Sequence, residues 1–217
     1  MNLIRPSFEI LHITDTLNLI EEAGRTCYKS NLGTTEERNR FILRRILGGH
    51  ESVLEHSLIS VKFICDRGVS HELVRHRLCA FSQESTRYCN YVGSAVEGGV
   101  TFILPCWMKD KDQYGEHDYP YGYQLWYEAM LNAEKYYRDL RITGWSPQQA
   151  RSVLPNSLKT EIIMSANFRE WRHILKLRTS KAAHPQMREI MQPLLFKLKE
   201  LVPIIFDDIN CKKEDIA

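Results

Sequence analysis

The sequence lacks paired cysteines, long apolar runs and a strong net charge, and each absence excludes a class of protein. Its cysteines are scattered, without a CxxC pair or the cysteine and histidine spacing of a zinc site, so we predict free thiols and no metal centre. The opening residues MNLIRPSFEILHIT place an arginine and a proline where a signal peptide needs a continuous apolar stretch, and no later segment approaches a membrane span. We therefore expect a soluble, cytoplasmic protein that does not act in a membrane.

The charges are nearly balanced, with 29 basic and 27 acidic side chains and a net charge of +2. Such a chain has no whole-surface field that would attract nucleic acid or an anionic membrane. Any anion that the protein binds must therefore be held by a local cluster of donors.

The length of 217 residues and the hydrophobic content of 43% are sufficient for one sizeable core. Strand-like and helix-like segments are mixed without a steady βαβ rhythm, which favours an α+β fold over a doubly wound sheet. We predict a single domain over residues 1–217, with a polar surface insertion near residues 107–122. Ser70 is predicted to cap a short helix over residues 71–78, and a final helix over residues 184–209 is expected to bend near Pro193.

The stretch ELVRHRLCAFSQESTRYCNY, residues 72–91, carries an unusual density of hydrogen-bond donors and too few apolar positions for a strand or a core helix. On a helix, Arg75 and Arg77 would diverge by about 200°, so they would serve different groups. If the following segment folds back, Ser82, Gln83, Ser85 and Arg87 approach Arg75. Such a pocket suits phosphates and the polar edge of a pyrimidine or flavin ring, whereas the simpler interpretation is a solvated helix end.

Further polar groups lie in other parts of the chain. His50, Ser52, Glu55 and His56 cluster before a predicted strand. Asn167 and Arg178 are three helical turns apart on one predicted helix, roughly 16 Å along its axis, which is about the reach of a nucleotide-sized ligand. Both residues also suit helix caps, so the structural and the functional interpretations remain open. Arg151, on another predicted helix, is either a fourth binding group or an exposed arginine.

The pattern RHR, followed by seven residues, a serine and then Arg-Tyr, resembles the motif of the flavin-dependent thymidylate synthases. The resemblance continues in order and spacing from His50 to about Ile190. It includes the segments GHESVLEH, ARSVLP, ANFREWRHILKLR and AHPQMREI.

The resemblance implies an enzyme that makes dTMP from dUMP for thymidylate biosynthesis. Methylenetetrahydrofolate would donate the carbon, FAD would be the redox carrier and NADPH the reductant. The implied fold is a mixed or antiparallel sheet flanked by helices, and the implied assembly is a homotetramer whose active sites are shared between subunits. The chain has no GxGxxG after a strand. The resemblance implies that side chains from several chains hold FAD instead.

The resemblance also assigns site residues. Arg178 would be catalytic, because a fixed guanidinium beside the uracil ring stabilises the negative charge that forms there, and it would contact the substrate too. Glu72 and His173 depart from the usual residues of the family at their positions. The residues implied for FAD are His50, Ser52, Arg75, His76, Arg77, Gln83, Asn167, Arg169 and His173. The residues implied for dUMP are Glu72, Arg75, Gln83, Glu84, Ser85, Thr86, Arg87, Arg151 and Arg178.

Two other functions are consistent with parts of the pattern. A nucleic-acid-binding module would use residues 75–91 as a basic surface with interleaved aromatic side chains, but the balanced charge opposes it. A phosphohydrolase that used the histidines would need paired acids and histidines for a metal, and the sequence does not supply that constellation.

Overall fold

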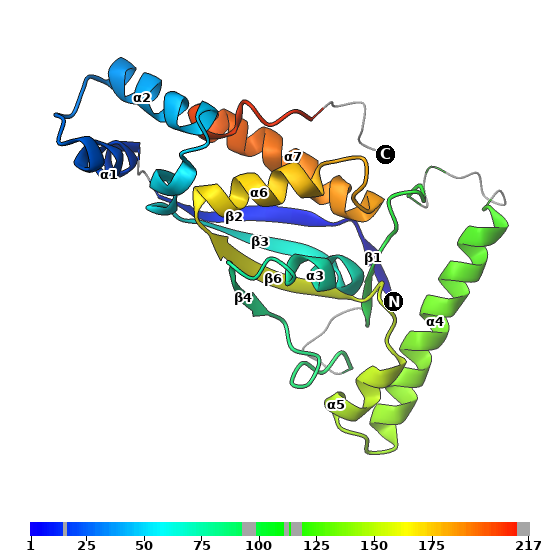
Figure 1. The fold of residues 1–217 in the computed structure, drawn as a ribbon. Coiled ribbons are helices and arrows are strands. Elements are labelled where there is room, and N and C mark those ends of the chain that lie inside the picture. The colour runs from blue at the N-terminus through cyan, green and yellow to red at the C-terminus, as the bar shows by residue number, and fades with distance from the viewer. Residues whose placement is uncertain (15–16, 93–98, 111–112, 114–118, 212–217) are drawn as a thin grey trace. The chain divides into compact units, whose positions relative to one another are not determined.

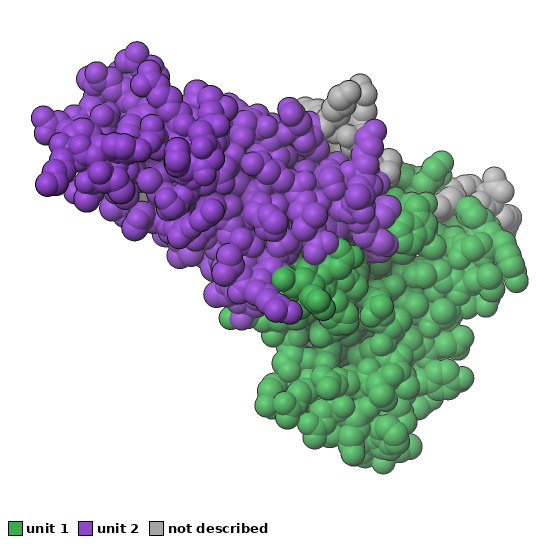
Figure 2. Space-filling model, in the orientation of Figure 1, with its two compact units in different colours: residues 1–7, 63–75, 82–162 green, residues 8–62, 76–81, 163–217 purple. Residues whose placement is uncertain are grey.

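The computed structural model of the chain describes residues 1–14, 17–92, 99–110, 113 and 119–211. The chain divides into two compact units (Figure 2). Unit 1 contains residues 1–7, 63–75 and 82–162, and unit 2 contains residues 8–62, 76–81 and 163–217. Each unit is therefore built from segments that lie far apart in the sequence.

Helices and strands are both well represented (Figure 1). The strands are β1 (Asn2–Ile4), β2 (Ser7–Ile13), β3 (Ile59–Asp66), β4 (Ala80–Gln83), β5 (Thr101–Ile103) and β6 (Lys159–Ala166). The α-helices are α1 (Leu17–Tyr28), α2 (Thr35–Leu47), α3 (Arg67–Leu73), α4 (Tyr121–Ile142), α5 (Pro147–Ala150), α6 (Phe168–Arg178), α7 (Pro185–Leu201) and α8 (Pro203–Phe206). The 3-10 helices in the described part of the chain are η1 (Glu51–Glu55) and η3 (Arg151–Val153). Four strands form a sheet in the order β2-β3-β6-β4, and β1 pairs in parallel with β5.

Unit 1 has its own apolar core between β5 and the α4 and α5 helices. The side chains of Phe102, Met130, Tyr137 and Leu158 are buried together in it. The Tyr91 backbone N–H donates to the Tyr137 hydroxyl at 3.4 Å, so the loop after β4 is attached to α4. This loop carries Glu84, Ser85, Thr86 and Arg87, which are predicted to bind the nucleotide.

Unit 2 is dominated by α6 and α7, which pack on each other (Figure 1). Trp171 of α6 is fully buried and donates its indole N–H to the Ile59 carbonyl of β3 at 3.1 Å. Phe168 of α6 packs edge-on against Phe206 of α8, with 5.9 Å between ring centroids. Burial of its apolar face thus fixes α6 in place, and the opposite face of the helix is directed outward.

The α+β prediction is confirmed, and three local predictions are wrong. The helix predicted over residues 71–78 begins at Arg67 instead, because Asp66 accepts the Val69 N–H at 2.8 Å and is the N-cap. The final helix stops at Leu201, where Val202 and Pro203 separate α7 from α8, and Pro193 is accommodated inside α7. The single domain and the surface insertion stay predictions, since residues 111–112 and 114–118 lie outside the described part.

The third correction concerns β4, a strand where the sequence indicated none. The Glu84 N–H donates to the Glu161 carbonyl at 2.9 Å, directly after the strand. Pairing with a neighbouring strand satisfies backbone groups whatever the side chains are, so a four-residue end strand forms without an apolar pattern. None of the described helices combines the length and the apolar character that a bilayer crossing requires.

Candidate active site

The RHR tripeptide lies beyond the end of α3, because that helix ends at Leu73. The helical divergence expected for Arg75 and Arg77 therefore does not apply. The His76 ring is buried, whereas both flanking arginines are exposed. The tripeptide thus presents two guanidinium groups to solvent and one imidazole to the interior of unit 2.

Gln83, at the end of β4, is held by two hydrogen bonds within unit 1. Its amide Nε2 donates to the Ser70 hydroxyl at 2.9 Å and to the Thr160 hydroxyl at 3.1 Å. An amide NH₂ has two hydrogens, and both are used here. The group that Gln83 can offer to a ligand is its carbonyl oxygen, an acceptor that suits a ring N–H.

Glu84, predicted to bind substrate, participates in a polar network of unit 1. Its carboxylate accepts from the Tyr91 hydroxyl at 2.8 Å and from the Lys159 ammonium at 3.1 Å. Burial, followed by the charge of Glu84, raises the pKa of Tyr91, so the phenol remains a donor. The sequence analysis missed Tyr91 and Lys159, because nothing in their local pattern indicates which acid they contact.

The rest of the predicted nucleotide loop is a turn that begins at Ser85. The N–H groups of Tyr88 and Cys89 donate to the Ser85 carbonyl, at 3.1 and 2.9 Å. Arg151 donates from Nη1 to the buried Thr86 hydroxyl at 3.0 Å, which ties the turn to η3. Unit 1 therefore brings Thr86 and Arg151 together, as the prediction of a common site requires.

One face of α6 lines a cavity of about 670 Å³ in unit 2. Arg169, His173 and Lys176 are spaced by four and three residues and so lie on one helical face. The full lining is Glu51, Glu55, Leu78, Asn167, Arg169, Glu170, His173 and Lys176. Lys176 is absent from the predicted site, although its helical spacing from Arg169 and His173 was visible in the sequence.

Asn167 and Arg169 are both engaged at the start of α6. The Asn167 side chain accepts the Glu170 N–H at 2.9 Å, so it is the N-cap that the sequence predicts. Arg169 Nη1 lies 2.5 Å from the Glu55 carboxylate, in an exposed pair. Exposed pairs of this kind contribute little to stability and are easily exchanged for a ligand anion.

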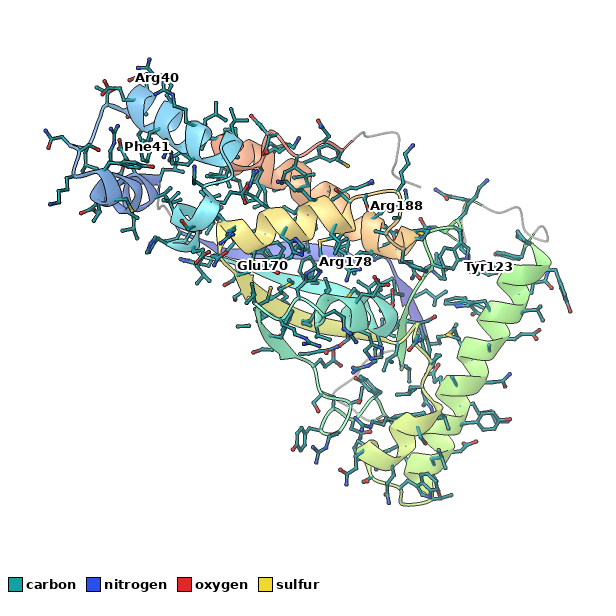
Figure 3. All side chains as sticks on the ribbon, in the orientation of Figure 1. Arg40, Phe41, Tyr123, Glu170, Arg178 and Arg188 are labelled. Carbon is teal, nitrogen blue, oxygen red and sulfur yellow. The ribbon has the colours of Figure 1, made fainter. Side chains whose placement is uncertain are left out.

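Arg178, at the last turn of α6, lies against His76. Its Nε donates to His76 Nε2 at 3.0 Å, and on the other side of the ring His76 Nδ1 lies 3.7 Å from Glu170 Oε1. Figure 3 labels Arg178 and Glu170 on α6. The predicted catalytic arginine and the predicted flavin-binding histidine are therefore direct neighbours in unit 2.

Burial determines the protonation of His76 and shifts the pKa of Glu170. Burial first, then the charge of Arg178 and that of His173, lower the pKa of His76 from 6.5 to about 4, so the imidazole is neutral at pH 7. Burial raises the pKa of Glu170. The carboxylate and the two imidazoles offer ligand atoms within 4.8 Å of one another, but the permanent charge of Arg178 beside them opposes a metal ion.

The side chains of His50, Ser52 and Arg87 are exposed, and that of Glu72 is partly buried. His50 precedes η1 and Ser52 lies within it, and both side chains are exposed. Glu72 is partly buried near the end of α3. Arg87 is exposed, with its guanidinium over the Tyr88 ring at 5.5 Å. These positions are open to a ligand but do not by themselves define one.

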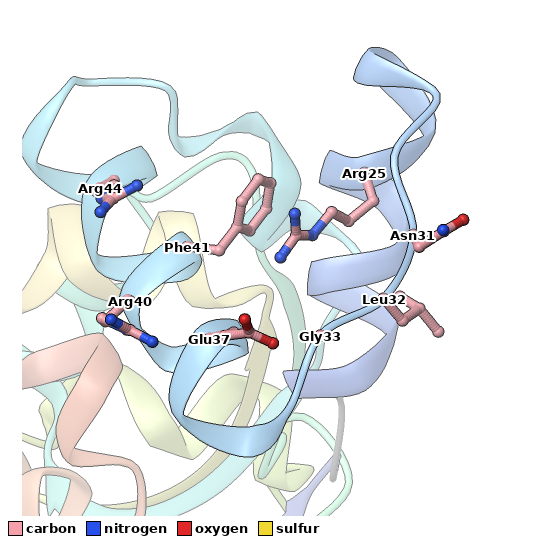
Figure 4. Close-up of a pocket in the computed structure, with 8 residues that line it drawn as sticks. All are labelled: Arg25, Asn31, Leu32, Gly33, Glu37, Arg40, Phe41 and Arg44. Atoms are coloured by element: carbon pink, nitrogen blue, oxygen red, sulfur yellow. The ribbon is translucent and has the colours of Figure 1, made fainter.

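A second cavity, of about 420 Å³, lies at the α1–α2 hairpin (Figure 4). Arg25 stacks over the Phe41 ring at 4.6 Å and pairs with Glu21 at 3.0 Å. Arg40 and Arg44 line the same cavity from α2. Among its described lining residues, none belongs to the predicted site, so this cavity adds nothing to the predicted chemistry.

The family model described as "Thymidylate synthase complementing protein" matches residues 9–204. That range includes every predicted site residue. Among solved structures, a UMP/dUMP methylase PolB from Streptomyces cacaoi, bound with 5-Br dUMP, has a TM-score of 0.78 and covers 95% of this chain and 96% of its own. Its sequence identity is 19%, so it shows that the fold is shared.

Curated relatives agree with the family model. A flavin-dependent thymidylate synthase of Thermococcus onnurineus is 34% identical over 168 residues, covering 75% of this chain and 64% of the relative. One from Corynebacterium aurimucosum is 32% identical over 203 residues, covering 88% of this chain and 79% of the relative. The chain thus spans slightly less than two thirds of the Thermococcus protein and more of the Corynebacterium one.

Proposed function

Because the chain belongs to the flavin-dependent thymidylate synthase family, we propose that it converts dUMP to dTMP. Methylenetetrahydrofolate supplies the carbon, FAD carries the reducing equivalents and NADPH supplies them. The proposal includes the homotetramer with shared active sites and the cytoplasmic location expected from the sequence. The observation that carries it is the direct contact of Arg178 with His76 within the matched region.

The donors of the α6 cavity fit a flavin dinucleotide. Arg169 and Lys176 offer cationic donors for a diphosphate, and Leu78 offers an apolar contact for a ring. His50, Ser52, Arg75, Arg77 and Gln83 complete the set that we assign to FAD. FAD, when bound, supplies a hydride carrier that the side chains of this chain do not provide.

The side chains of unit 1 are assigned to dUMP. Ser85 and Arg87 would take its phosphate, and the carbonyl oxygen of Gln83 would accept a ring N–H. Glu72, Glu84, Thr86 and Arg151 complete this set. Glu84 acts through its bonds to Tyr91 and Lys159, which fix the loop.

Arg178 is the proposed catalytic residue. The uracil ring must collect negative charge before its C5 attacks the folate carbon, and a guanidinium held beside the ring stabilises that charge. The pKa of Cys79 is raised to about 12, first by burial and then by Glu170, so this thiol inside the motif is no nucleophile at neutral pH. Cys79 therefore has no covalent role in the proposed reaction.

The deciding experiment measures tritium release from C5-labelled dUMP with FAD, NADPH and methylenetetrahydrofolate. The wild-type protein should release tritium only when all components are present. Arg178→Ala should still bind flavin but lose dUMP-dependent oxidation of the reduced flavin, because the ring charge is no longer stabilised.

The matched control is Lys176→Ala, on the same helix but assigned to flavin binding. It should lower the affinity for FAD and recover turnover at high FAD, whereas Arg178→Ala should not recover. Near-normal turnover of Arg178→Ala would remove the catalytic role, and a colourless wild-type protein that does not bind FAD would remove the whole function.

A further inference from the structure

Glu170 occupies the third position of α6, where an acid normally serves the helix cap. In α2 the equivalent acid, Glu37, does this, and its carboxylate accepts the Thr34 N–H at 2.8 Å in a capping box. Glu170 receives its backbone cap from Asn167 but directs its carboxylate Oε1 toward His76 Nδ1. The residue is also buried, at 8% exposure, where an acid without a partner is costly.

The contacts of His76 determine which ring nitrogen carries its proton. An arginine is always protonated and can only donate, so His76 Nε2 must accept the bond from Arg178 Nε. A neutral imidazole has one N–H, and its hydrogen must then be on Nδ1. That hydrogen faces the Glu170 carboxylate at 3.7 Å, a distance at which the negative charge still favours this tautomer.

We propose that Glu170 is a positioning residue for Arg178, which it orients through the tautomer of His76. The proposal depends on the catalytic role of Arg178 proposed above. With the Nδ1–H tautomer fixed, Nε2 remains an acceptor and holds the guanidinium plane in one direction. An arginine side chain that is already ordered loses less entropy when the charged ring forms beside it.

Other groups around the ring are consistent with this role. His173 lies edge-on to His76, with 6.0 Å between ring centroids, and Cys79 is close enough for Glu170 to raise its pKa. Neither group would hold the proton of His76 on Nδ1, since a second imidazole can both accept and donate and a protonated thiol is a weak donor. The carboxylate of Glu170, 3.7 Å from Nδ1, supplies the negative charge that favours the Nδ1–H tautomer.

The tautomer can be measured without any turnover. Nitrogen-15 NMR of histidine-labelled protein distinguishes Nδ1–H from Nε2–H, and the His76 signals are assigned by their loss in His76→Gln. The wild type should show Nδ1–H. Glu170→Ala should shift His76 toward Nε2–H, whereas Glu170→Gln, whose amide oxygen keeps a partial negative charge near Nδ1, should keep Nδ1–H.

The kinetic test uses dUMP-dependent oxidation of the reduced flavin. Glu170→Ala should lower the rate about 10- to 100-fold, as removal of an orienting partner typically does, while KM for dUMP changes little. Glu170→Gln should restore most of the rate. The matched control Glu37→Gln, the third residue of α2, should leave the rate unchanged because it affects only a helix cap.

The outcomes separate the inference from the proposed function. A wild-type His76 with its proton on Nε2, or a Glu170→Ala protein with unchanged tautomer and rate, would overturn the positioning role. If Glu170→Ala does not fold, the His76 tautomers of the wild type and of Glu170→Gln still test the positioning role. Absence of tritium release from the wild type would remove the function of the site and leave the tautomer result intact.

Discussion

His76 is a buried, neutral histidine, and this makes the fold sensitive to mild acid. In the unfolded chain its pKa is near 6.5, but in the folded protein it is about 4. Between these values the unfolded state binds the additional proton, so the free energy of unfolding falls as the pH falls. Over the whole range between the two pKa values, the free energy of unfolding changes by on the order of 3 kcal/mol. Glu170, whose pKa is raised by burial, acts in the opposite direction.

We therefore expect wild-type stability to fall between pH 7 and pH 5 by more than that of His76→Gln, which has no imidazole to protonate. Urea unfolding at both pH values measures the difference. His71→Gln, which removes an exposed histidine of α3, is the control and should follow the wild type. Equal pH dependence of His76→Gln and the wild type would contradict the prediction.

At the scale of elements, Arg172 joins α6 to η1 and to the segment after α8. Its guanidinium is 1% exposed and bonds to Glu51 at 3.1 Å and to Asp208 at 2.5 Å, and it also donates to the Ile205 carbonyl. The bond from Arg172 holds the pKa of Asp208 below its usual value. Other residues of α6 line the proposed flavin cavity or contact His76, so this anchor also orients the site.

Removing one partner of a buried ion network leaves the others charged and unpaired. Arg172→Ala should therefore lower the free energy of unfolding by about 3–5 kcal/mol. Lys197→Ala, which breaks the exposed Lys197–Glu200 pair of α7, should change it by about 1 kcal/mol or less. Urea unfolding at pH 7 compares them, and similar losses in both variants would show that Arg172 is no anchor.

At the scale of the whole molecule, the proposal is a homotetramer whose active sites are shared between subunits. Light scattering should then give about four times the chain mass of 25.4 kDa. Arg178→Ala chains should be inactive alone, as should Arg75→Ala and Arg87→Ala chains, because each lacks one part of the site.

Mixed tetramers test the sharing directly. When Arg178→Ala chains are exchanged with Arg75→Ala or with Arg87→Ala chains, at least one mixture should regain activity, up to about a quarter of the wild-type rate if the two residues of a site come from different subunits. A monomeric mass, or no recovery in either mixture, would reject shared sites.

The sequence by itself determined the family, the α+β class and the N-cap of α6. Asn167 was readable as a cap because a cap is a contact between residues three apart in the chain. The RHR motif and its companion segments also identified the candidate site residues, because they are local patterns.

Only the tertiary structure decided how these residues act. The β4 strand forms through backbone pairing with a distant segment, and the Glu170 carboxylate leaves its cap for the ring of His76, far earlier in the chain. Arg178 and His76 are separated by 102 residues. Contacts over such distances depend on how the elements pack, and no local periodicity or motif encodes the partner that a buried charge will find.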